Sequence, residues 1–269
     1  MTEKENPDFV TIDGEEYEIS TTTKVDLSGA DVSDESLQYL SCLKNLEYLT
    51  LNDTAVSGEC LKYLIGLKNL KNLYLYTGSI SAEGLKYLGD LKNLENLYLQ
   101  TTGSVSIEGF KYLGGLKNLK SLFLYDEHLE DLSYLKGLKN LIFLNVSGTA
   151  VSNESLKYLS GLKNLGSLNL NSTAVSDEGL KYLSDLKNLT ELGLSDIAVS
   201  DEGLKYLSDL KNLTGLCLNG TAVSDKGLKY FIGLKNLNML HLEKTMVTMK
   251  GVTLLKESLP DTTMPYLTL

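Results

Sequence analysis

One repeated motif constrains this chain more than any other feature. It reads L-K-N-L-x-x-L-x-L-x-x-T-A-V-S-D-E-G-L-K-Y-L-S-G, and a clean copy runs from Leu162 to Asp185. The copies are spaced by 24, 24, 25, 22, 24, 24, 24 and 24 residues, and a partial copy spans Val25 to Ser41. They begin at Leu43, Leu67, Leu91, Leu116, Leu138, Leu162, Leu186, Leu210 and Leu234. A fixed period in this range indicates a solenoid.

The L-x-L core of each copy predicts a short strand with one buried face, because leucine alternates with outward residues. The second half of the copy changes period: Leu180 and Leu183 lie three apart, as on one side of a helix. Ser176 is a candidate N-cap, and Asp177 and Glu178 place negative charge at the helix start. We expect strands at Val25–Leu27, Leu49–Leu51, Leu73–Leu75, Leu97–Leu99, Leu122–Leu124, Leu144–Val146, Leu168–Leu170, Leu192–Leu194, Leu216–Leu218 and Leu240–Leu242.

The repeat resembles the leucine-rich repeat family, in its bacterial type with 24-residue repeats, over roughly residues 25–258. One such unit cannot bury its leucines alone, so neighbours must stack. The resemblance implies an α/β leucine-rich-repeat solenoid, or horseshoe, with a parallel β-sheet on the concave face and short helices on the convex face. It also implies a protein-recognition module rather than an enzyme.

Both ends of the chain depart from the repeat, and we interpret them as caps over the apolar core. Asp13-Gly14 separates two strand-like runs, which predicts a hairpin. This hairpin resembles the cap that precedes the repeats in some surface proteins of gut Gram-positive bacteria. Pro260 ends the last helix. The predicted organisation is an N-terminal hairpin cap at 1–24, about ten repeats at 25–258 and a C-terminal cap at 259–269.

The composition argues against nucleic acid as a partner. The net charge is −10 and all 25 basic residues are lysine, whereas phosphate recognition depends on clustered positive charge and on arginine forks. The three cysteines, Cys42, Cys60 and Cys217, lie far apart in the repeat order and form no disulfide framework and no metal spacing. We expect all three cysteines to serve as small, semi-buried residues. No apolar run is long enough to span a membrane.

The chemistry of an enzyme is missing from the sequence. The only histidines, His128 and His241, lie more than four repeats apart, and we find no nucleophile–base–acid set, no Gly-rich phosphate loop and no cofactor motif. Asp126, Glu127, Glu130 and Asp131 gather acid around His128, so a divalent metal site is one reading of that turn. A solvated acidic turn is the other. We therefore predict no enzyme activity, no cofactor and no metal.

Aromatic residues set the first half of the chain apart from the second. At the outward strand positions the first half carries rings with amides among them, whereas the second half carries mostly Asn, Ser and Gly. Exposed tyrosine is enriched in binding surfaces, so we predict a ligand site on the concave face. The alternative is that the rings only pack on one another as cross-strand neighbours. The predicted site is Tyr48, Asn72, Tyr74, Tyr76, Asn96, Tyr98, Gln100, Phe123, Tyr125 and Phe143.

Three further patterns are local. A tyrosine recurs on the convex side of each repeat, and we expect these rings to stack on one another as architecture. A lysine and an asparagine recur in L-K-N-L and are also read as architectural, since Asn suits the turn before each strand. Two consecutive repeats are irregular, with 25 and 22 residues. We expect the extra residue to bulge at Thr101–Ser104 beside the aromatic site, and a tight turn to replace the helix over 130–136.

Two functions remain open from the sequence. The first is a non-enzymatic module that binds a protein or peptide on the concave face. The second is a structural spacer or scaffold region of a larger bacterial surface protein. We expect a monomer at the cell surface or secreted, with a cytoplasmic location as the alternative.

Overall fold

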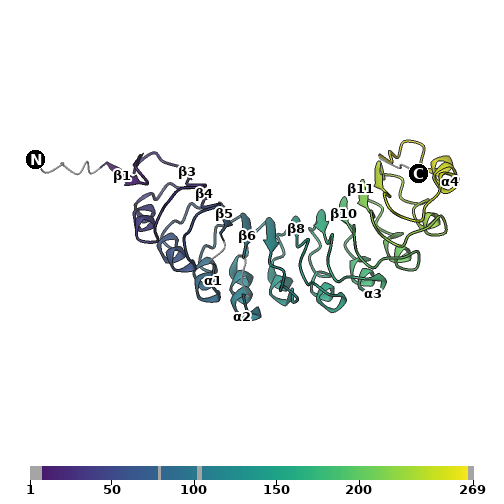
Figure 1. The fold of residues 1–269 in the computed structure, drawn as a ribbon, viewed down its shortest axis with the longest axis horizontal. Helices are drawn as coiled ribbons and strands as arrows, with labels where there is room; N and C mark the ends of the chain where they lie inside the picture. Colours follow the sequence, from purple (N-terminus) through teal and green to yellow (C-terminus); the bar gives the residue numbers. More distant parts are fainter. Residues whose placement is uncertain (1–7, 78–79, 102–104, 266–269) are drawn as a thin grey trace, which may run out of the picture. The chain divides into compact units, whose positions relative to one another are not determined.

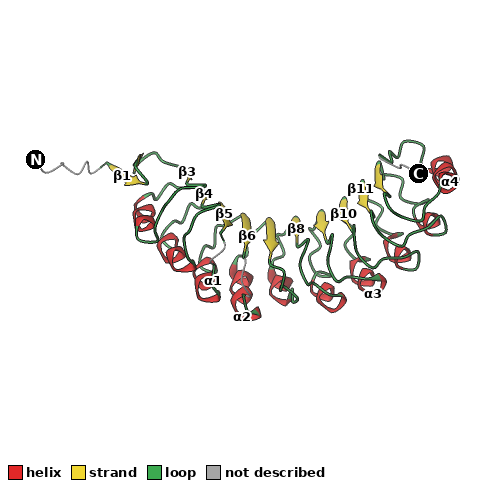
Figure 2. Ribbon diagram, viewed as in Figure 1, coloured by secondary structure: helices red, strands yellow, loops and turns green. Residues whose placement is uncertain are grey.

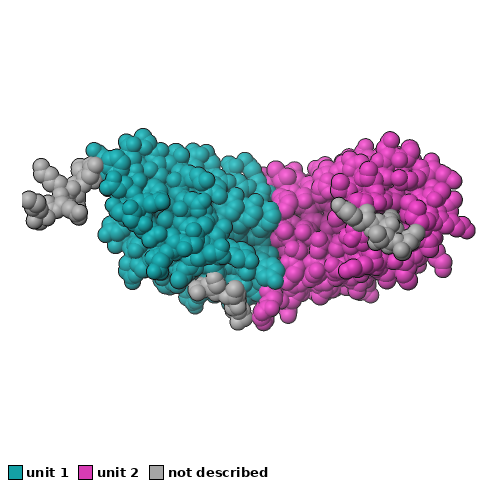
Figure 3. Space-filling view, turned by 45° about the horizontal axis from the view of Figure 1, so that its top comes forward, with its two compact units in different colours: residues 1–126 teal, residues 127–269 magenta. Residues whose placement is uncertain are grey.

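The computed structural model describes residues 8–77, 80–101 and 105–265. These residues form two compact units, Met1–Asp126 and Glu127–Leu269, which Figure 3 colours separately. In each unit the strands lie along one side and the short helices along the other (Figures 1 and 2). The fold is therefore the expected α/β solenoid, with parallel strands and helices on opposite sides.

The parallel strands follow the repeat order within each unit. Each strand pairs with the strand one repeat away, and the leucines align: Leu73 lies opposite Leu97, and Leu192 opposite Leu216. In unit 1 the described strands are β3 (Lys24–Asp26), β4 (Tyr48–Thr50), β5 (Asn72–Tyr76), β6 (Asn96–Gln100) and β7 (Ser121–Tyr125). In unit 2 they are β8 (Phe143–Asn145), β9 (Ser167–Asn169), β10 (Glu191–Gly193), β11 (Gly215–Cys217) and β12 (Met239–His241).

These strands begin one residue earlier than the predicted L-x-L cores. The residue before the first leucine, such as Tyr48, already pairs with the next strand. The second leucine still donates its amide to the ladder, as Leu51 does to the Tyr74 carbonyl at 2.9 Å, before the chain turns away. The buried leucines of both kinds form the core, and Leu49 and Leu51 have no exposed surface.

The described helices are short, and most of them are 3₁₀ rather than α-helical. Unit 1 contains 3₁₀ helices at Ser36–Cys42, Gly58–Leu64 and Lys111–Gly115, with α1 (Ala82–Leu88) and α2 (Ile107–Phe110). Unit 2 contains 3₁₀ helices at Ser133–Gly137, Asn153–Tyr158, Lys181–Leu183, Gly203–Leu207 and Gly227–Tyr230, with α3 (Asp177–Leu180) and α4 (Met249–Ser258).

The irregular repeats behave in part as expected. No helix covers 130–132, and the 3₁₀ helix of that repeat begins at Ser133. The difference in helix length between this repeat and its neighbours is smaller than predicted, since their helices are also short. The expected bulge falls on residues 102–104, which lie outside the described part of the chain.

The predicted hairpin forms near the N-terminus. β1 (Phe9–Ile12) pairs antiparallel with β2 (Glu15–Glu18), and the turn residues Asp13 and Gly14 both have positive φ. Val10 and Ile12 are buried while Phe9 and Thr11 face out. At the other end, Thr263 pairs with Met239 beyond β12. In the described part of the chain, no helix is long and apolar enough to cross a membrane.

One of the predicted architectural ladders, that of the asparagines, joins neighbouring repeats. The L-K-N-L asparagine donates its amide to the carbonyl of the L-K-N-L lysine one repeat earlier, as Asn69 does to Lys44 at 2.9 Å and Asn188 to Lys163 at 2.8 Å. The convex tyrosines differ from the prediction. In six copies the ammonium of the preceding lysine, rather than another ring, lies over the ring, as Lys181 does over Tyr182 at 4.9 Å.

Candidate functional site

The parallel register of β4 to β7 collects outward side chains into three columns on the solvent side of the sheet, which we call the strand face. This is the face that the sequence predicted to be concave. Because each strand pairs one repeat away, equivalent positions become neighbours. The first column is Tyr48, Asn72, Asn96 and Ser121. The middle column is Thr50, Tyr74, Tyr98 and Phe123. The third column is Tyr76, Gln100 and Tyr125.

Four rings form one stack along the face. The centroids of Tyr74 and Tyr98 lie 4.3 Å apart and those of Tyr98 and Phe123 3.9 Å apart, with interplanar angles of 13° and 14°. Tyr48 adds a tilted contact to Tyr74 at 5.1 Å, and the Lys24 ammonium lies 4.9 Å from the Tyr48 centroid. The alternative reading of the aromatic residues, packing on cross-strand neighbours, thus holds for the middle column.

The stack changes the titration of its phenols. Burial raises the pKa of Tyr74 above its ordinary value, and the neighbouring Tyr98 phenol adds to the shift. Burial also raises the pKa of Tyr48, with a further contribution from Tyr74. These rings therefore stay neutral at physiological pH and form a fixed, uncharged surface.

The third column is different, because its rings lie open to solvent. Tyr76 is 53% exposed and Tyr125 is 49% exposed. Gln100 lies between them in the register, and its side-chain amide has no hydrogen-bond partner among the described residues. Two exposed rings with an unengaged amide between them can contact a partner without rearrangement of the stack.

The first column supplies amides that are partly engaged. Asn96 donates to the side-chain oxygen of Asn72 at 2.7 Å, and Asn72 donates to the Glu47 carbonyl at 3.4 Å. Nine of the ten predicted site residues thus lie together in unit 1. We call this set the aromatic face. Its members are Tyr48, Asn72, Tyr74, Tyr76, Asn96, Tyr98, Gln100, Phe123 and Tyr125. The tenth residue, Phe143, lies in β8 of unit 2 and is half-buried.

Side chains of unit 2 cover the glycine positions on its own strand face. The side chains of Asn169 and Asn171 lie where a Cβ on Gly193 would project, and the Glu191 carboxylate lies over Gly215. Thr214 donates to that carboxylate at 2.9 Å. The glycines of this half therefore do not open a pocket on the strand face.

One pair in unit 2 was missed by the sequence analysis. Cys217 and His241 are register partners on adjacent strands, and their spacing of one repeat could have revealed this. Burial raises the pKa of the Cys217 thiol, with a further contribution from Glu191, so the thiol is not activated as a nucleophile. Among the residues that the structure describes, no group of three or more His, Cys, Asp or Glu side chains could hold a metal ion.

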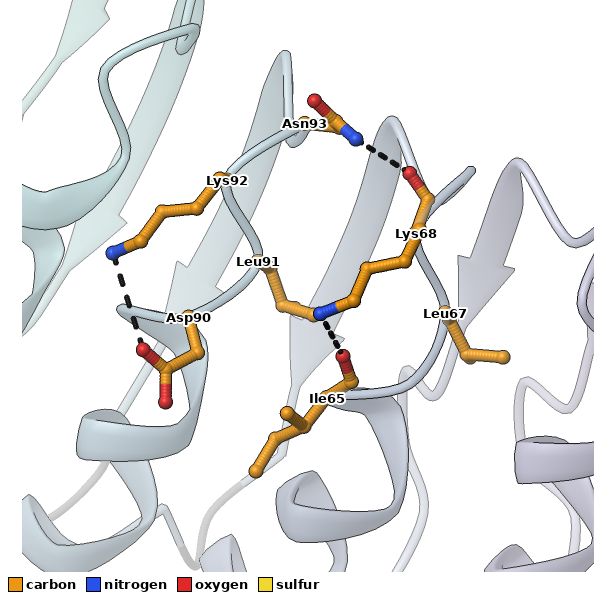
Figure 4. Close-up of a pocket in the computed structure, with 7 residues that line it drawn as sticks. All are labelled: Ile65, Leu67, Lys68, Asp90, Leu91, Lys92 and Asn93. Atoms are coloured by element: carbon orange, nitrogen blue, oxygen red, sulfur yellow. Dashed lines mark hydrogen bonds and ion pairs between the residues drawn. The ribbon is translucent and has the colours of Figure 1, made fainter.

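A small cavity of about 80 Å³ lies in unit 1 between consecutive L-K-N-L turns (Figure 4). Its polar groups belong to the turn architecture: Lys68 donates to the Ile65 carbonyl at 2.9 Å, and Asn93 donates to the Lys68 carbonyl at 2.7 Å. Sites for drug-sized ligands are several times larger, on the order of 300 Å³ or more. We therefore do not assign this cavity a ligand.

The comparison with known families decides the identity of the repeat. A family model described as "Leucine-rich repeat region" matches residues 24–260, well over half of the chain. The chain belongs to the leucine-rich repeat family. No curated protein is significantly similar to it in a full comparison.

Solved leucine-rich repeat structures share the fold at low identity. An internalin from Listeria monocytogenes aligns with a TM-score of 0.58 and 20% identity, over 95% of this chain and 91% of that one. A leucine-rich repeat protein of Leptospira interrogans aligns with a TM-score of 0.58 and 22% identity, over 91% and 72%. The ectodomain of the Arabidopsis receptor kinase HAESA, solved with a peptide hormone ligand, aligns with a TM-score of 0.58 and 19% identity. That alignment covers 81% of this chain and 37% of the receptor chain.

Proposed function

We propose that this leucine-rich repeat chain is a non-enzymatic recognition module that binds a protein or peptide on the strand face of unit 1. Leucine-rich repeats are commonly protein-interaction modules, and the HAESA ectodomain was solved with a peptide on a similar fold. The proposed contact residues are the nine residues of the aromatic face. The tenth residue of the sequence prediction, Phe143, lies in unit 2 and stays a separate prediction.

The observation that carries the proposal is the exposure of Tyr76 and Tyr125 beside an ordered stack. Tyrosine offers a large contact area and loses little side-chain entropy on binding, and it is enriched in binding surfaces together with Ser and Asn. Rings that served only to pack would be covered by their neighbours, and those of the middle column are only partly exposed. Instead, half of each ring-bearing side chain in the third column faces water.

The second candidate is a spacer or scaffold region of a larger surface protein. In unit 2 the strand face favours a spacer or scaffold function, since its glycine positions are covered by side chains of the same unit. The two functions are compatible, with unit 1 for recognition and unit 2 for support. We propose a cell-surface or secreted location and a monomeric state for both.

A peptide-display selection tests the recognition function. The probe is a random-peptide library, panned on the wild-type protein and on a Tyr76→Ala/Tyr125→Ala double variant. The matched control is Tyr112→Ala, which removes a ring of 47% exposure from a 3₁₀ helix of the same unit. Peptides that bind wild type and the control but lose about tenfold or more in affinity for the double variant support the proposal. If no enriched peptide distinguishes the double variant, the aromatic face is not a recognition surface.

A further inference from the structure

The aromatic face carries no formal charge, although the chain as a whole has a net charge of −10. From β4 to β7, all outward positions in the three columns hold Tyr, Phe, Asn, Gln, Ser or Thr. The strand face of unit 2 is also nearly uncharged, with Glu191 as its carboxylate, so the aromatic face differs from it in its rings.

Among the described residues, some of the charges at the border of this face are paired, and others are not. Lys71 lies 3.1 Å from the Glu47 carboxylate and Lys120 lies 2.7 Å from the Glu95 carboxylate, on the side where the strands begin. Beyond Tyr48, Lys24 lies over a ring, and the Asp26 carboxylate accepts hydrogen bonds from Ser28, which lower its pKa. Asp53, whose backbone amide donates to the Tyr76 carbonyl at 2.9 Å, adds an exposed carboxylate at the border. The three columns themselves offer no counter-charge to an ion brought onto the face.

The spacing of the side chains in the third column also constrains the partner. Tyr76 and Tyr125 lie two strands apart, which is about 10 Å at ordinary strand spacing. Between them stands the unengaged amide of Gln100. The two exposed rings can contact one apolar or aromatic side chain of a partner, and the Gln100 amide between them can bond to a peptide group.

Resting on the proposed recognition function, we propose that the partner segment is an extended, uncharged peptide that places an apolar or aromatic side chain between Tyr76 and Tyr125. Its backbone amide bonds to Gln100. A charged side chain at this place would lose hydration without gaining a counter-charge from the three columns, so the face selects against it. Association lacks electrostatic steering, and its affinity is nearly independent of salt.

The test uses the peptides enriched on the wild-type protein that depend on Tyr76 and Tyr125. We expect these peptides to contain aromatic or aliphatic residues and no net charge in the shared motif. Their Kd should change by less than about twofold between about 0.05 and 0.5 M salt, because no screened charge pair is involved. Patch-dependent peptides with a basic or acidic motif, or a Kd that rises more than about tenfold over that range, would overturn the inference and leave the recognition function standing.

A charge placed at the centre of the column provides a second readout. In Gln100→Glu, the wild-type peptides should bind at least about tenfold more weakly, and a new selection should enrich Lys or Arg at the same motif position. A Gln100→Asn variant keeps the amide and should retain the uncharged preference. Unchanged enrichment on Gln100→Glu would overturn the placement of the partner over Gln100.

Two further outcomes separate the proposals. Absence of any patch-dependent peptide overturns both the inference and the recognition function. Binding of a neutral oligosaccharide such as cellohexaose to the wild-type protein and not to the double variant, without patch-dependent peptides, assigns the face to carbohydrate and overturns the peptide assignment.

Discussion

The carboxylate of Asp201 accepts two hydrogen bonds from Ser224, one from its backbone amide at 2.8 Å and one from its hydroxyl at 2.6 Å. The same arrangement joins Asp177 to Ser200 and Asp225 to Thr248. At Ser176 an asparagine takes the place of the aspartate: the Asn153 side chain accepts from the Ser176 backbone amide and donates to its hydroxyl. Ser176 lies at the N-cap position of α3 without a side-chain capping bond, and its backbone amide and hydroxyl are bonded to the preceding repeat. We call this set the Asp–Ser ladder.

The first prediction concerns one rung of this ladder. Asp201→Ala should lower the free energy of unfolding by about 1–3 kcal/mol, because the partly buried amide and hydroxyl of Ser224 lose a charged acceptor. Urea unfolding followed by circular dichroism measures the change. Glu202→Ala is the control, since Glu202 makes only an exposed ion pair with Lys205 at 3.8 Å and should cost less than about 0.5 kcal/mol. Equal effects of the two substitutions would show that the rung does not stabilise the fold.

The second prediction concerns the ring stack. Tyr98→Ala removes the ring that contacts both Tyr74 and Phe123, so it should cost about 1–3 kcal/mol more than Tyr76→Ala, which lies outside the stack. Thermal and urea unfolding of both variants measure the difference. If the two variants unfold at the same midpoint, the stack does not stabilise the sheet. Because of this expected loss, Tyr74 and Tyr98 are poor choices for testing binding.

The third prediction concerns Cys60. Burial raises the pKa of its thiol from 9.0 to about 12, so the thiol stays protonated and inert in the folded protein. We expect iodoacetamide at neutral pH to label the exposed Cys42 first and Cys60 only after unfolding, as mass spectrometry of digests would show. Labelling of Cys60 at the rate of Cys42 in native buffer would contradict its burial.

The same shift has a consequence for stability at alkaline pH. The folded state holds the thiol proton more tightly than the unfolded state does, so the contribution of Cys60 is constant below about pH 9 and is lost as pH rises toward 12. The wild-type unfolding midpoint should therefore fall more steeply in that window than the midpoint of Cys60→Ala. Parallel curves for the two proteins would refute the linkage.

The fourth prediction concerns the proposed N-terminal cap. Ile12 is 1% exposed, so Ile12→Ala should cost about 2–5 kcal/mol if the hairpin covers the end of the core. Thr11→Ala on the exposed side of the same strand is the control and should be nearly neutral. Light scattering and melting temperature measure the effect. An unchanged melting curve for Ile12→Ala would mean that the hairpin is not a cap.

The strands and their register could be predicted from the sequence because both follow from the leucine period. Helix type could not be predicted from spacing, since Leu180 and Leu183 lie three apart in an α-turn and in a 3₁₀ turn alike. The columns of the aromatic face also follow from the register. The division between a packed middle column and an exposed third column depends on side-chain rotamers, which the sequence pattern does not specify. The pairing of Cys217 with His241 is the reverse case, because the 24-residue period predicts it although the sequence interpretation did not include it.

The Asp–Ser ladder has a consequence for the number of repeats. Each rung joins two residues 23 positions apart in sequence, and neighbouring copies supply identical partners. A duplicated copy inserted next to Asp177–Ser200 would offer its own aspartate to the following serine and its own serine to the preceding aspartate. Insertion of half a copy would instead leave an acceptor and an amide unpaired. We therefore expect recombination between near-identical copies to yield chains that can still fold when the length changes by a whole repeat.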